Sequence, residues 1–351
     1  MTPTAQQLGA LAAAVVLAGC LPEGSPPWLV DHPIAAALRV DVAERGPYGA
    51  EPPRAGTVIA QVMPGDAIRV TPFIVGPDGP ADLEALRPAW FYCPLSACFG
   101  ALTGGDDLRP CGAEPVPPED TCSLGAGPEG RLQLGELISF NYGRVPALFM
   151  VSGTPGGLST QECLQRLRGL RARAESLEEC LMMIEPLPLG PAWRVVILAA
   201  FLGLPDALPP SVIPADALTS EPNVFPRIEP FELAITGLDG EVREQVAVDR
   251  DTIAVRPGEL VEIVAPLDPA DAQFYVDALV RNGQLNPFTA AFEVMSSSWL
   301  FSREVGFAIS EPQVIEWRVP ADATGAIHTY YLLSDTRAIV WAWLRFEVEA
   351  P

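Results

Sequence analysis

A Pro-Gly-acid turn that leads into an alternating strand occurs twice in this chain, at residues 63–72 and again at residues 256–266. Proline fixes φ for the turn, glycine supplies the position with positive φ, and the acid caps the turn. Each copy is followed by a segment that carries a tryptophan, Trp90 after the first and Trp299 after the second. Two copies of one β pattern predict two domains of one kind.

Proline and glycine are spread along the whole chain, which also favours a mainly β fold. The 351 residues include 38 Pro and 30 Gly and show few long helical patterns, as expected for many short strands joined by turns. We predict two β-sandwich domains, residues 34–207 and 227–351, joined by a proline-rich linker, residues 208–226. An apolar run, Trp193–Leu204, is predicted to be a buried strand that closes the first domain; a core helix is the alternative.

The N-terminal residues resemble the export signal of a bacterial lipoprotein. An uncharged apolar run ends in Leu-Ala-Gly-Cys, with Cys20 as its last residue, which is similar to a lipobox. The apolar stretch and the small residues that a secretory signal needs are present, although residues 1–7 contain no Arg or Lys. We predict a signal peptide over residues 1–19, a lipid on Cys20 and an extended tether over residues 20–33. An ordinary N-terminal helix with a buried cysteine is the alternative.

Six cysteines follow Cys20, and an even number in an exported chain predicts three disulfides. These cysteines are Cys93, Cys98, Cys111, Cys122, Cys163 and Cys180. We predict a Cys163–Cys180 bridge and, inside a Cys-rich loop at residues 93–122, a nested pair, Cys93–Cys122 and Cys98–Cys111. Zinc is the alternative, but there is no Cys-x-x-Cys pair, and the two histidines, His32 and His328, lie far from this cluster in sequence.

A repeated pattern predicts a helical insertion over residues 159–185 of the first domain. Ser-x-x-Glu-Cys-Leu begins at Ser159 and again at Ser176. Serine followed three residues later by glutamate is a capping box, which marks a helix start, so we predict a hairpin of two short helices. The alternative is one continuous helix. At ~1.5 Å per residue it would hold Cys163 and Cys180 about 25 Å apart, too far for a disulfide.

The two turn-and-strand copies resemble bacterial immunoglobulin-like and PKD-like modules, which often carry a Pro-Gly-acid turn before an early strand. The end of the second copy strengthens the match, with Ile-Glu-Trp-Arg-Val-Pro at residues 315–320 and strand patterns at residues 325–334 and 338–348. From its Pro-Trp-Leu-Val-Asp segment onward, the chain is also similar to uncharacterised lipoproteins of myxobacteria and their relatives. The resemblance implies two immunoglobulin-like β-sandwich domains and a location in the cell envelope. It implies no activity.

The charge of the chain argues against nucleic acid as a partner. The net charge is −22 and all 22 basic residues are arginine, so the protein should repel nucleic acid and anionic surfaces. The sequence contains no nucleophile elbow, zinc-protease motif, phosphate loop or dinucleotide fingerprint. The chain also has two histidines, so few of its side chains are of the type most often used for acid–base catalysis. We therefore predict no catalytic residue and no cofactor.

Acidic residues provide two alternatives to this prediction. Paired carboxylates are what a glycan hydrolase requires, and the candidates are Asp106-Asp107, Glu178-Glu179 and Asp249/Asp251. Calcium is the second alternative, because hard cations bind several oxygens on a turn. The acids that suggest it are Asp239, Glu241, Asp249, Asp251, Asp268 and Asp271. None has the spacing of a known calcium loop, so no metal site is predicted.

Two tryptophans near the C-terminus form the predicted contact surface. On a strand over residues 339–349, alternation places the core face at Val340, Ala342, Leu344, Phe346 and Val348. Trp341 and Trp343 fall on the opposite, otherwise polar face. Paired aromatics on such a face can bind a sugar ring or a partner protein. The alternative is that a neighbouring loop or the first domain covers them.

These patterns together predict an exported lipoprotein that acts as a non-enzymatic binding or scaffolding module of the cell envelope. The lipid bilayer is the expected partner, through acylated Cys20, and another envelope protein or a glycan is the expected ligand. Leu21 after the lipid cysteine favours the outer membrane, by analogy with other bacteria. The alternative function is hydrolysis of an envelope glycan.

Overall fold

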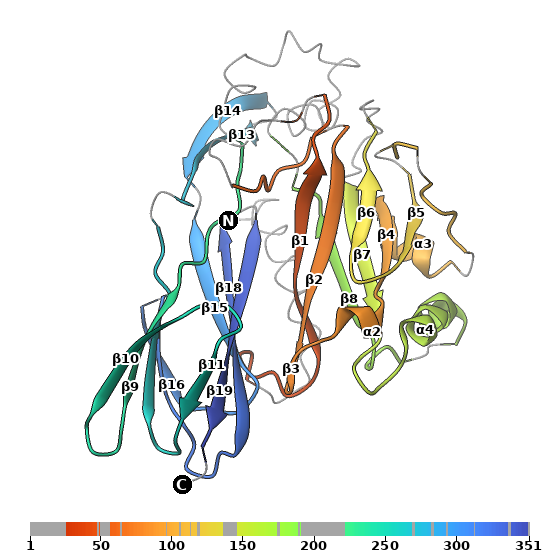
Figure 1. Ribbon diagram of the computed structural model, residues 1–351. Helices are drawn as coiled ribbons and strands as arrows, with labels where there is room; N and C mark the ends of the chain where they lie inside the picture. The colour runs from red at the N-terminus through yellow and green to blue at the C-terminus, as the bar shows by residue number, and fades with distance from the viewer. Residues whose placement is uncertain are drawn as a thin grey trace, which may run out of the picture.

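The computed structural model is mainly β, as predicted, and its sheets stack in layers (Figure 1). It describes residues 26–47, 49, 57–63, 65–95, 97–104, 107–112, 114–117, 120–135, 146–173, 176–188, 190, 222–268, 271–281, 284–292, 294–311, 313–335 and 338–349. The predicted signal peptide, Cys20 and the apolar run Trp193–Leu204 lie outside the described residues.

The first sandwich, built from β1 to β8, consists of two four-stranded sheets. One sheet contains β1 (Ile34–Glu44), β2 (Ala67–Gly76), β3 (Gly79–Pro80) and β6 (Gly130–Gln133). The other has the order β5 (Cys122–Ala126), β4 (Ala89–Pro94), β7 (Pro146–Ser152) and β8 (Leu181–Pro186). Trp90 and Tyr92 of β4 are fully buried between the two sheets. Alternating apolar residues on facing strands therefore supply the core.

The second sandwich, built from β9 to β19, again has two facing sheets. One has the order β10 (Val242–Ala247), β9 (Phe231–Thr236), β12 (Leu260–Val264), β17 (Val314–Arg318) and β16 (Phe307–Glu311). The other has the order β11 (Thr252–Val255), β19 (Ile339–Val348), β18 (Gly325–Asp335) and β15 (Met295–Phe301). Trp299 and Trp317 are buried between them. A separate hairpin pairs β13 (Phe274–Arg281) with β14 (Gln284–Phe292).

The two predicted Pro-Gly-acid turns have matching hydrogen bonds. Asp66 Oδ2 accepts from the backbone N–H of Met63 at 2.7 Å, and Glu259 Oε2 accepts from that of Arg256 at 2.8 Å. The glycine of each turn has a φ of 82° in the first copy and 85° in the second, the region that favours glycine. β2 and β12 begin directly after these turns. The predicted repeat of turn and strand is confirmed.

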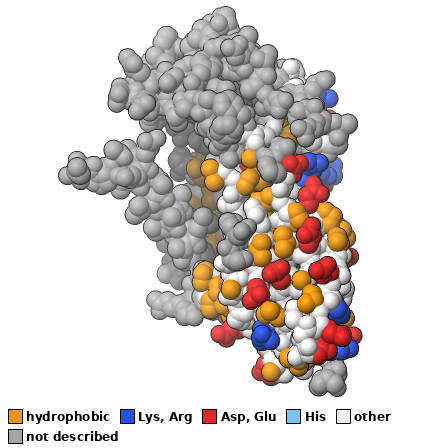
Figure 2. Space-filling model, turned by 90° about the vertical axis from the view of Figure 1, so that its left-hand side faces the viewer, with side chains coloured by type: hydrophobic (Ala, Val, Ile, Leu, Met, Phe, Trp, Pro, Cys, Tyr) orange, Lys and Arg blue, Asp and Glu red, His pale blue; other side chains and the backbone are white. Residues whose placement is uncertain are grey.

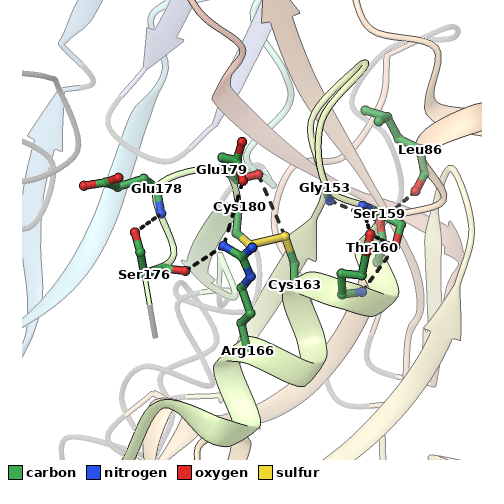
Figure 3. Close-up of a disulfide and its surroundings, with 11 residues drawn as sticks. Leu86, Gly153, Ser159, Thr160, Cys163, Arg166, Ser176, Glu178, Glu179 and Cys180 are labelled. Atoms are coloured by element: carbon green, nitrogen blue, oxygen red, sulfur yellow. Dashed lines mark hydrogen bonds and ion pairs between the residues drawn. A yellow bond between two sulfur atoms is a disulfide. The ribbon is translucent and has the colours of Figure 1, made fainter. Parts of the chain in front are cut away.

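The predicted helical hairpin is wrong in its second half, because the insertion holds one helix, α4 (Thr160–Arg173) (Figure 3). At its start Glu162 accepts from the backbone N–H of Ser159 at 2.8 Å, as the capping box predicts. The second copy of the pattern forms a turn in which Ser176 Oγ accepts from the N–H of Glu178 at 3.3 Å. The chain then enters β8, which pairs with β7, so sheet pairing overrides the local helix signal.

Two shorter helices complete the first sandwich, α2 (Leu83–Leu86) and α3 (Cys98–Leu102). Asp82 caps α2 by accepting from the backbone N–H of Glu84 at 3.0 Å. α4 covers the outer face of the β4–β7 pair, where Leu167 is buried in one cluster with Phe91 and Phe149. α3 and α4 therefore lie on the side of the first sandwich away from the second, whereas α2 lies at one end of the first sandwich (Figure 1).

The three disulfides confirm one predicted pairing and correct the other two. Cys163 is bonded to Cys180 across 17 residues. The nested pair is wrong, because the bridges are Cys93–Cys98 and Cys111–Cys122. A tight turn after β4, in which the N–H of Ala97 donates to the carbonyl of Pro94 at 2.8 Å, returns the chain to Cys93. The backbone N–H of Cys111 donates to the Ser123 carbonyl at 2.8 Å, which sets Cys111 beside Cys122.

The two sandwiches pack sheet against sheet, so β1 and β2 lie next to β18 and β19 (Figure 1). This contact buries Val30, Ala37, Phe73, Val75 and Tyr330 in one cluster. Ala60 of the first half of the chain is also buried within the core cluster of the second sandwich. The two sandwiches are therefore joined through a continuous apolar contact.

Part of the predicted tether is paired with the second sandwich before the chain enters β1. Leu29 forms a parallel bridge with Phe301 of β15. The N–H of Val30 donates to the Phe301 carbonyl at 2.8 Å, and the N–H of Phe301 donates to the Trp28 carbonyl at 2.9 Å. The Trp28 ring meets that of Phe307 edge to face at 4.9 Å. This N-terminal clamp, residues 28–30, holds the start of the first sandwich to the second.

The bridges should differ in their contribution to stability. Replacing Cys163 and Cys180 together by alanine should lower the free energy of unfolding by about 3 kcal/mol. The bridge restricts the unfolded chain by closing a loop of this length, and the variant lacks that restriction. The Cys93 and Cys98 double replacement should cost only about 2 kcal/mol, since its loop is far shorter. Urea unfolding measures both, and equal losses would contradict the loop-entropy account. Peptide mapping without reduction checks the three pairings.

Candidate binding cleft between the two sandwiches

Aromatic contacts and one buried hydrogen bond fix the two sandwiches relative to each other. The hydroxyl of Tyr330 on β18 donates to the backbone carbonyl of Gly76 at the end of β2, at 2.6 Å. Burial raises the pKa of this phenol above its usual range, so it remains a donor. The ring of Phe73 stacks on Trp341, with centroids 5.0 Å apart and planes 10° from parallel. These contacts hold β2 against β18 and β19 at the interface between the two sandwiches.

A cleft of about 600 Å³ opens beside this contact, within the ~300–1,000 Å³ range of small-molecule sites. Its lining comes from both sandwiches. Trp341 and Trp343 of β19 supply the aromatic part, and arginines and aspartates of β1, β2 and the turn before β11 supply the charges. The cleft therefore combines flat apolar surfaces with hydrogen-bonding groups.

The first sandwich contributes a carboxylate held by two arginines. Asp41 on β1 is 5 % exposed. It accepts from Nε of Arg39 at 2.7 Å and from Nη2 of Arg69 at 3.4 Å. Arg69 has a second acidic neighbour, because its Nε lies 3.7 Å from Oε2 of Glu129. The Arg39 guanidinium lies 4.3 Å from the centroid of the Phe225 ring. This part of the cleft is a fixed network of paired charges.

The second sandwich contributes a turn that is bonded to the strand carrying the indoles. Asp249 Oδ1 accepts from the backbone N–H of Trp343 at 3.0 Å, and the N–H of Arg250 donates to the Trp343 carbonyl at 2.7 Å. Arg250 has a φ of 73°, an uncommon value for a residue with a side chain. Its Nε lies 3.2 Å from Asp249. The strained residue is thus held by β19 at the edge of the cleft.

The strand alternation around the two indoles is as predicted. Val340, Ala342, Leu344, Phe346 and Val348 are all buried in the core of the second sandwich. Trp341 and Trp343 lie on the opposite face and are only partly exposed. The first sandwich covers one face of Trp341, which is the alternative that the sequence left open. Both indoles also line the cleft.

Sequence reasoning missed the charged residues of the first sandwich. Arg39 and Asp41 alternate with the core residues Leu38 and Val40 of β1, and Arg69 lies between the core residues of β2. Because charged residues on the non-core face of a strand are typical of an ordinary solvated surface, the sequence alone does not mark these three as a site. Their convergence with a turn of the other sandwich is not visible in the sequence.

The acidic pairs suggested for hydrolysis occupy ordinary surface or turn positions. Asp107 pairs with Arg168 at 2.6 Å, and its neighbour Asp106 lies outside the described residues. Glu178 and Glu179 are exposed. Asp251 accepts from the backbone N–H of Val248 at 2.8 Å, as a turn cap. Of these acids, Asp249 is the one among those described that lines the cleft.

The acids suggested for calcium have other partners. Asp268 and Asp271 pair with Arg227 at 3.0 and 3.4 Å. Asp239 accepts from the backbone N–H of Glu241 at 3.1 Å. Within the described ranges, three or more His, Cys, Asp or Glu side chains nowhere gather in a way that could hold a metal ion.

A second cavity brings together two carboxyl groups that the sequence did not pair. This cavity, of about 260 Å³, is lined by Glu185 of β8 and Asp335 of β18 among mainly apolar residues. Desolvation raises the pKa of Glu185 to about 7. Asp335 is fully buried, and its Oδ1 accepts from the backbone N–H of Ala338 at 2.7 Å. The two acids are far apart in sequence, so no local pattern marks them.

The outer face of the second sandwich carries many acidic side chains among hydrophobic ones (Figure 2). Glu262 of β12 lies directly opposite Glu316 of β17 in the strand register. Like charges in this position repel each other and any anionic partner. Of the helices that the structure describes, none has the length and apolar character needed to cross a membrane.

The stacked pair should link the two sandwiches energetically. Trp341→Ala in the whole chain should lower the free energy of unfolding by about 2 kcal/mol, less than for a fully buried tryptophan. A double-mutant cycle with Phe73→Ala should show a coupling of about 1 kcal/mol. Ile309→Ala, at an exposed position of β16, is the control and should change little. A coupling near zero would mean that the stack does not join the sandwiches.

Glu185 should make stability fall as the pH rises. Its pKa is about 7 in the folded chain, above the usual 4.5. Between these two values the folded chain keeps the proton on Glu185, whereas the unfolded chain has lost it. The stability is full below about pH 4.5 and falls, by at most about 3 kcal/mol, as the pH passes through 7. Glu185→Gln should remove this fall, as seen by urea unfolding between pH 5 and 8. Parallel pH curves for the two proteins would contradict the prediction.

No protein-family model and no curated protein matches this chain. Among solved structures, the chain is similar to the crystal structure of domains 4 and 5 of the S-layer protein SbsC, at 7% sequence identity. The match covers 90% of this chain and 100% of that one, with a TM-score of 0.18. A likeness at this level carries no conclusion about fold or function.

Proposed function

We propose that this protein is an exported, lipid-anchored module of the cell envelope that binds its partner in the cleft between the two sandwiches, without catalysing a reaction. The cleft is the observation that carries the proposal. It has the volume of a ligand site, two indoles and a fixed set of charges from both sandwiches. A site of this kind provides recognition groups that need no rearrangement before binding.

The disulfides support a location outside the cytoplasm. All six cysteines after Cys20 are paired in three bridges, and such bridges persist in oxidising compartments. The Leu-Ala-Gly-Cys sequence that ends at Cys20 adds the lipid anchor to the proposal. Kinship with immunoglobulin-like and PKD-like lipoproteins, and a place at the outer membrane, belong to the same proposal.

Glu185 and Asp335 favour a second candidate, the hydrolysis of an envelope glycan. A carboxylic acid with a pKa near 7 is suited to act as a general acid, with a second carboxylate as its partner. The surroundings favour this candidate less than binding. The cavity is small and mainly apolar, and Asp335 already accepts a backbone hydrogen bond.

The anchor is tested by Cys20→Ser in the native envelope. The variant should move from the detergent phase to the soluble fraction, because it lacks the residue that carries the lipid. Cys20→Ala is the matched second variant, since serine and alanine both lack a thiol. Retention of both variants in the membrane fraction would contradict the lipoprotein proposal.

The binding role is tested by cross-linking from the cleft. A photo-reactive residue in place of Thr71, which lines the cleft, should capture an envelope component. The same residue in place of Ile309, on the far side of the second sandwich, should not capture it. Hydrolysis of envelope glycans that is lost in Glu185→Gln, without capture from position 71, would favour the hydrolase instead.

A further inference from the structure

We infer that the cleft is built for an uncharged, polyhydroxylated ring, such as a neutral sugar residue of an envelope glycan. This inference rests on the proposed binding function and names the chemical class of its ligand. It combines three observations: the flat rings on one side, the paired state of the three arginines that the structure describes in the lining, and the fixed position of both sets of groups.

The indoles provide a surface for the apolar face of a ring. Trp341 is held in place by its stack on Phe73, so it forms a rigid end to the cleft. Trp343 meets the ring of His328 at 5.8 Å with planes tilted by 54°, an inclined contact rather than a stack. Both indoles are partly exposed where they line the cleft. Flat aromatic surfaces of this kind pack well on the C–H faces of sugars.

The charges of the cleft are already paired with one another. Arg39 and Arg69 share Asp41, and Arg250 lies beside Asp249. An anionic ligand would have to displace one of these carboxylates or approach it closely, at an electrostatic cost. Burial also lowers the pKa of His328 beside Trp343, so that ring adds no positive charge at neutral pH. The lining is therefore unsuited to a free phosphate or carboxylate.

Hydroxyl groups, in contrast, can bind to the hydrogen-bond donors and acceptors that remain unused in the charge pairs. A guanidinium has five N–H donors and a carboxylate has about four lone-pair sites, so each pair retains unused donors and acceptors. A hydroxyl both donates and accepts, which allows it to bond to both members of a pair. Asp41 is buried and Asp249 is bonded to the backbone of Trp343, so these acceptors are fixed relative to the indoles. Adjacent hydroxyls on one ring match this arrangement.

The test measures saccharide binding to the detergent-solubilised full chain by calorimetry and tryptophan fluorescence. The neutral probes are hexasaccharides of glucose, of mannose and of N-acetylglucosamine, and the anionic probes are trigalacturonate and inorganic phosphate. We expect a neutral probe to bind more tightly than either anion. Trp343→Leu, which retains apolar bulk but loses the flat ring, should weaken this binding roughly tenfold or more.

A second pair of variants guards against loss of folding. Arg250→Gly suits the positive φ of this position and should also weaken binding roughly tenfold, since it removes one charge pair from the cleft. Arg256→Ala is the matched control, because Arg256 is similarly exposed, at 70 % against 75 %, and pairs with Glu349 at 3.3 Å outside the cleft. Its binding should be unchanged. Equal losses in the two variants would overturn the assignment to the cleft.

The remaining outcomes separate the ligand from the function. Tighter binding of phosphate or trigalacturonate would overturn the inference in favour of an anion site. If no neutral probe binds while cross-linking from position 71 captures an envelope protein, the sugar inference fails and the binding function stands. If no neutral probe binds and cross-linking from position 71 captures nothing, both fail.

Discussion

The contact between the β1–β2 face and the β18–β19 face is the feature on which the rest of this molecule depends. Each sandwich has its own core, but the cleft exists because the two outer faces are held together, with Phe73, Trp341 and Tyr330 at the centre of that contact. Apart from each other, β1 and β2 would present a strip of paired charges, and β19 would expose two indoles. Joined, they form a concave site whose two kinds of chemistry come from different halves of the chain.

The features that the sequence predicted correctly are those that depend on neighbouring residues. The acid at the end of each Pro-Gly turn bonds to a backbone group three residues earlier, so a short motif is enough to identify it. The alternation along β19 separates Val340 and Ala342 from Trp341, because side chains on a strand alternate between its two faces. The Cys163–Cys180 bridge was also predictable, since one continuous helix would hold the two cysteines too far apart and the chain must turn back between them.

The features that sequence reasoning missed depend on contacts between distant segments. The helix signal at Ser176 gave way to pairing of β8 with β7, and the bridges of Cys93 and Cys111 follow from the turn after β4 and from the bonding of the chain beside β5. Arg39, Asp41 and Arg69 look unremarkable as isolated charges. Their role in a shared site is set by how two sheets pack, which no local pattern encodes.

The N-terminal clamp has a mechanical consequence. Because residues 28–30 pair in parallel with β15, a pull on residue 26 that is directed along β15 shears the bonds between Val30, Trp28 and Phe301 together. The tension therefore enters the second sandwich before it reaches the first strand of the first sandwich. The two halves share the load, and the frame of the cleft is not the first part of the molecule to be strained. A protein held at its N-terminal end under flow or drag would thus keep its two sandwiches together for as long as the clamp holds.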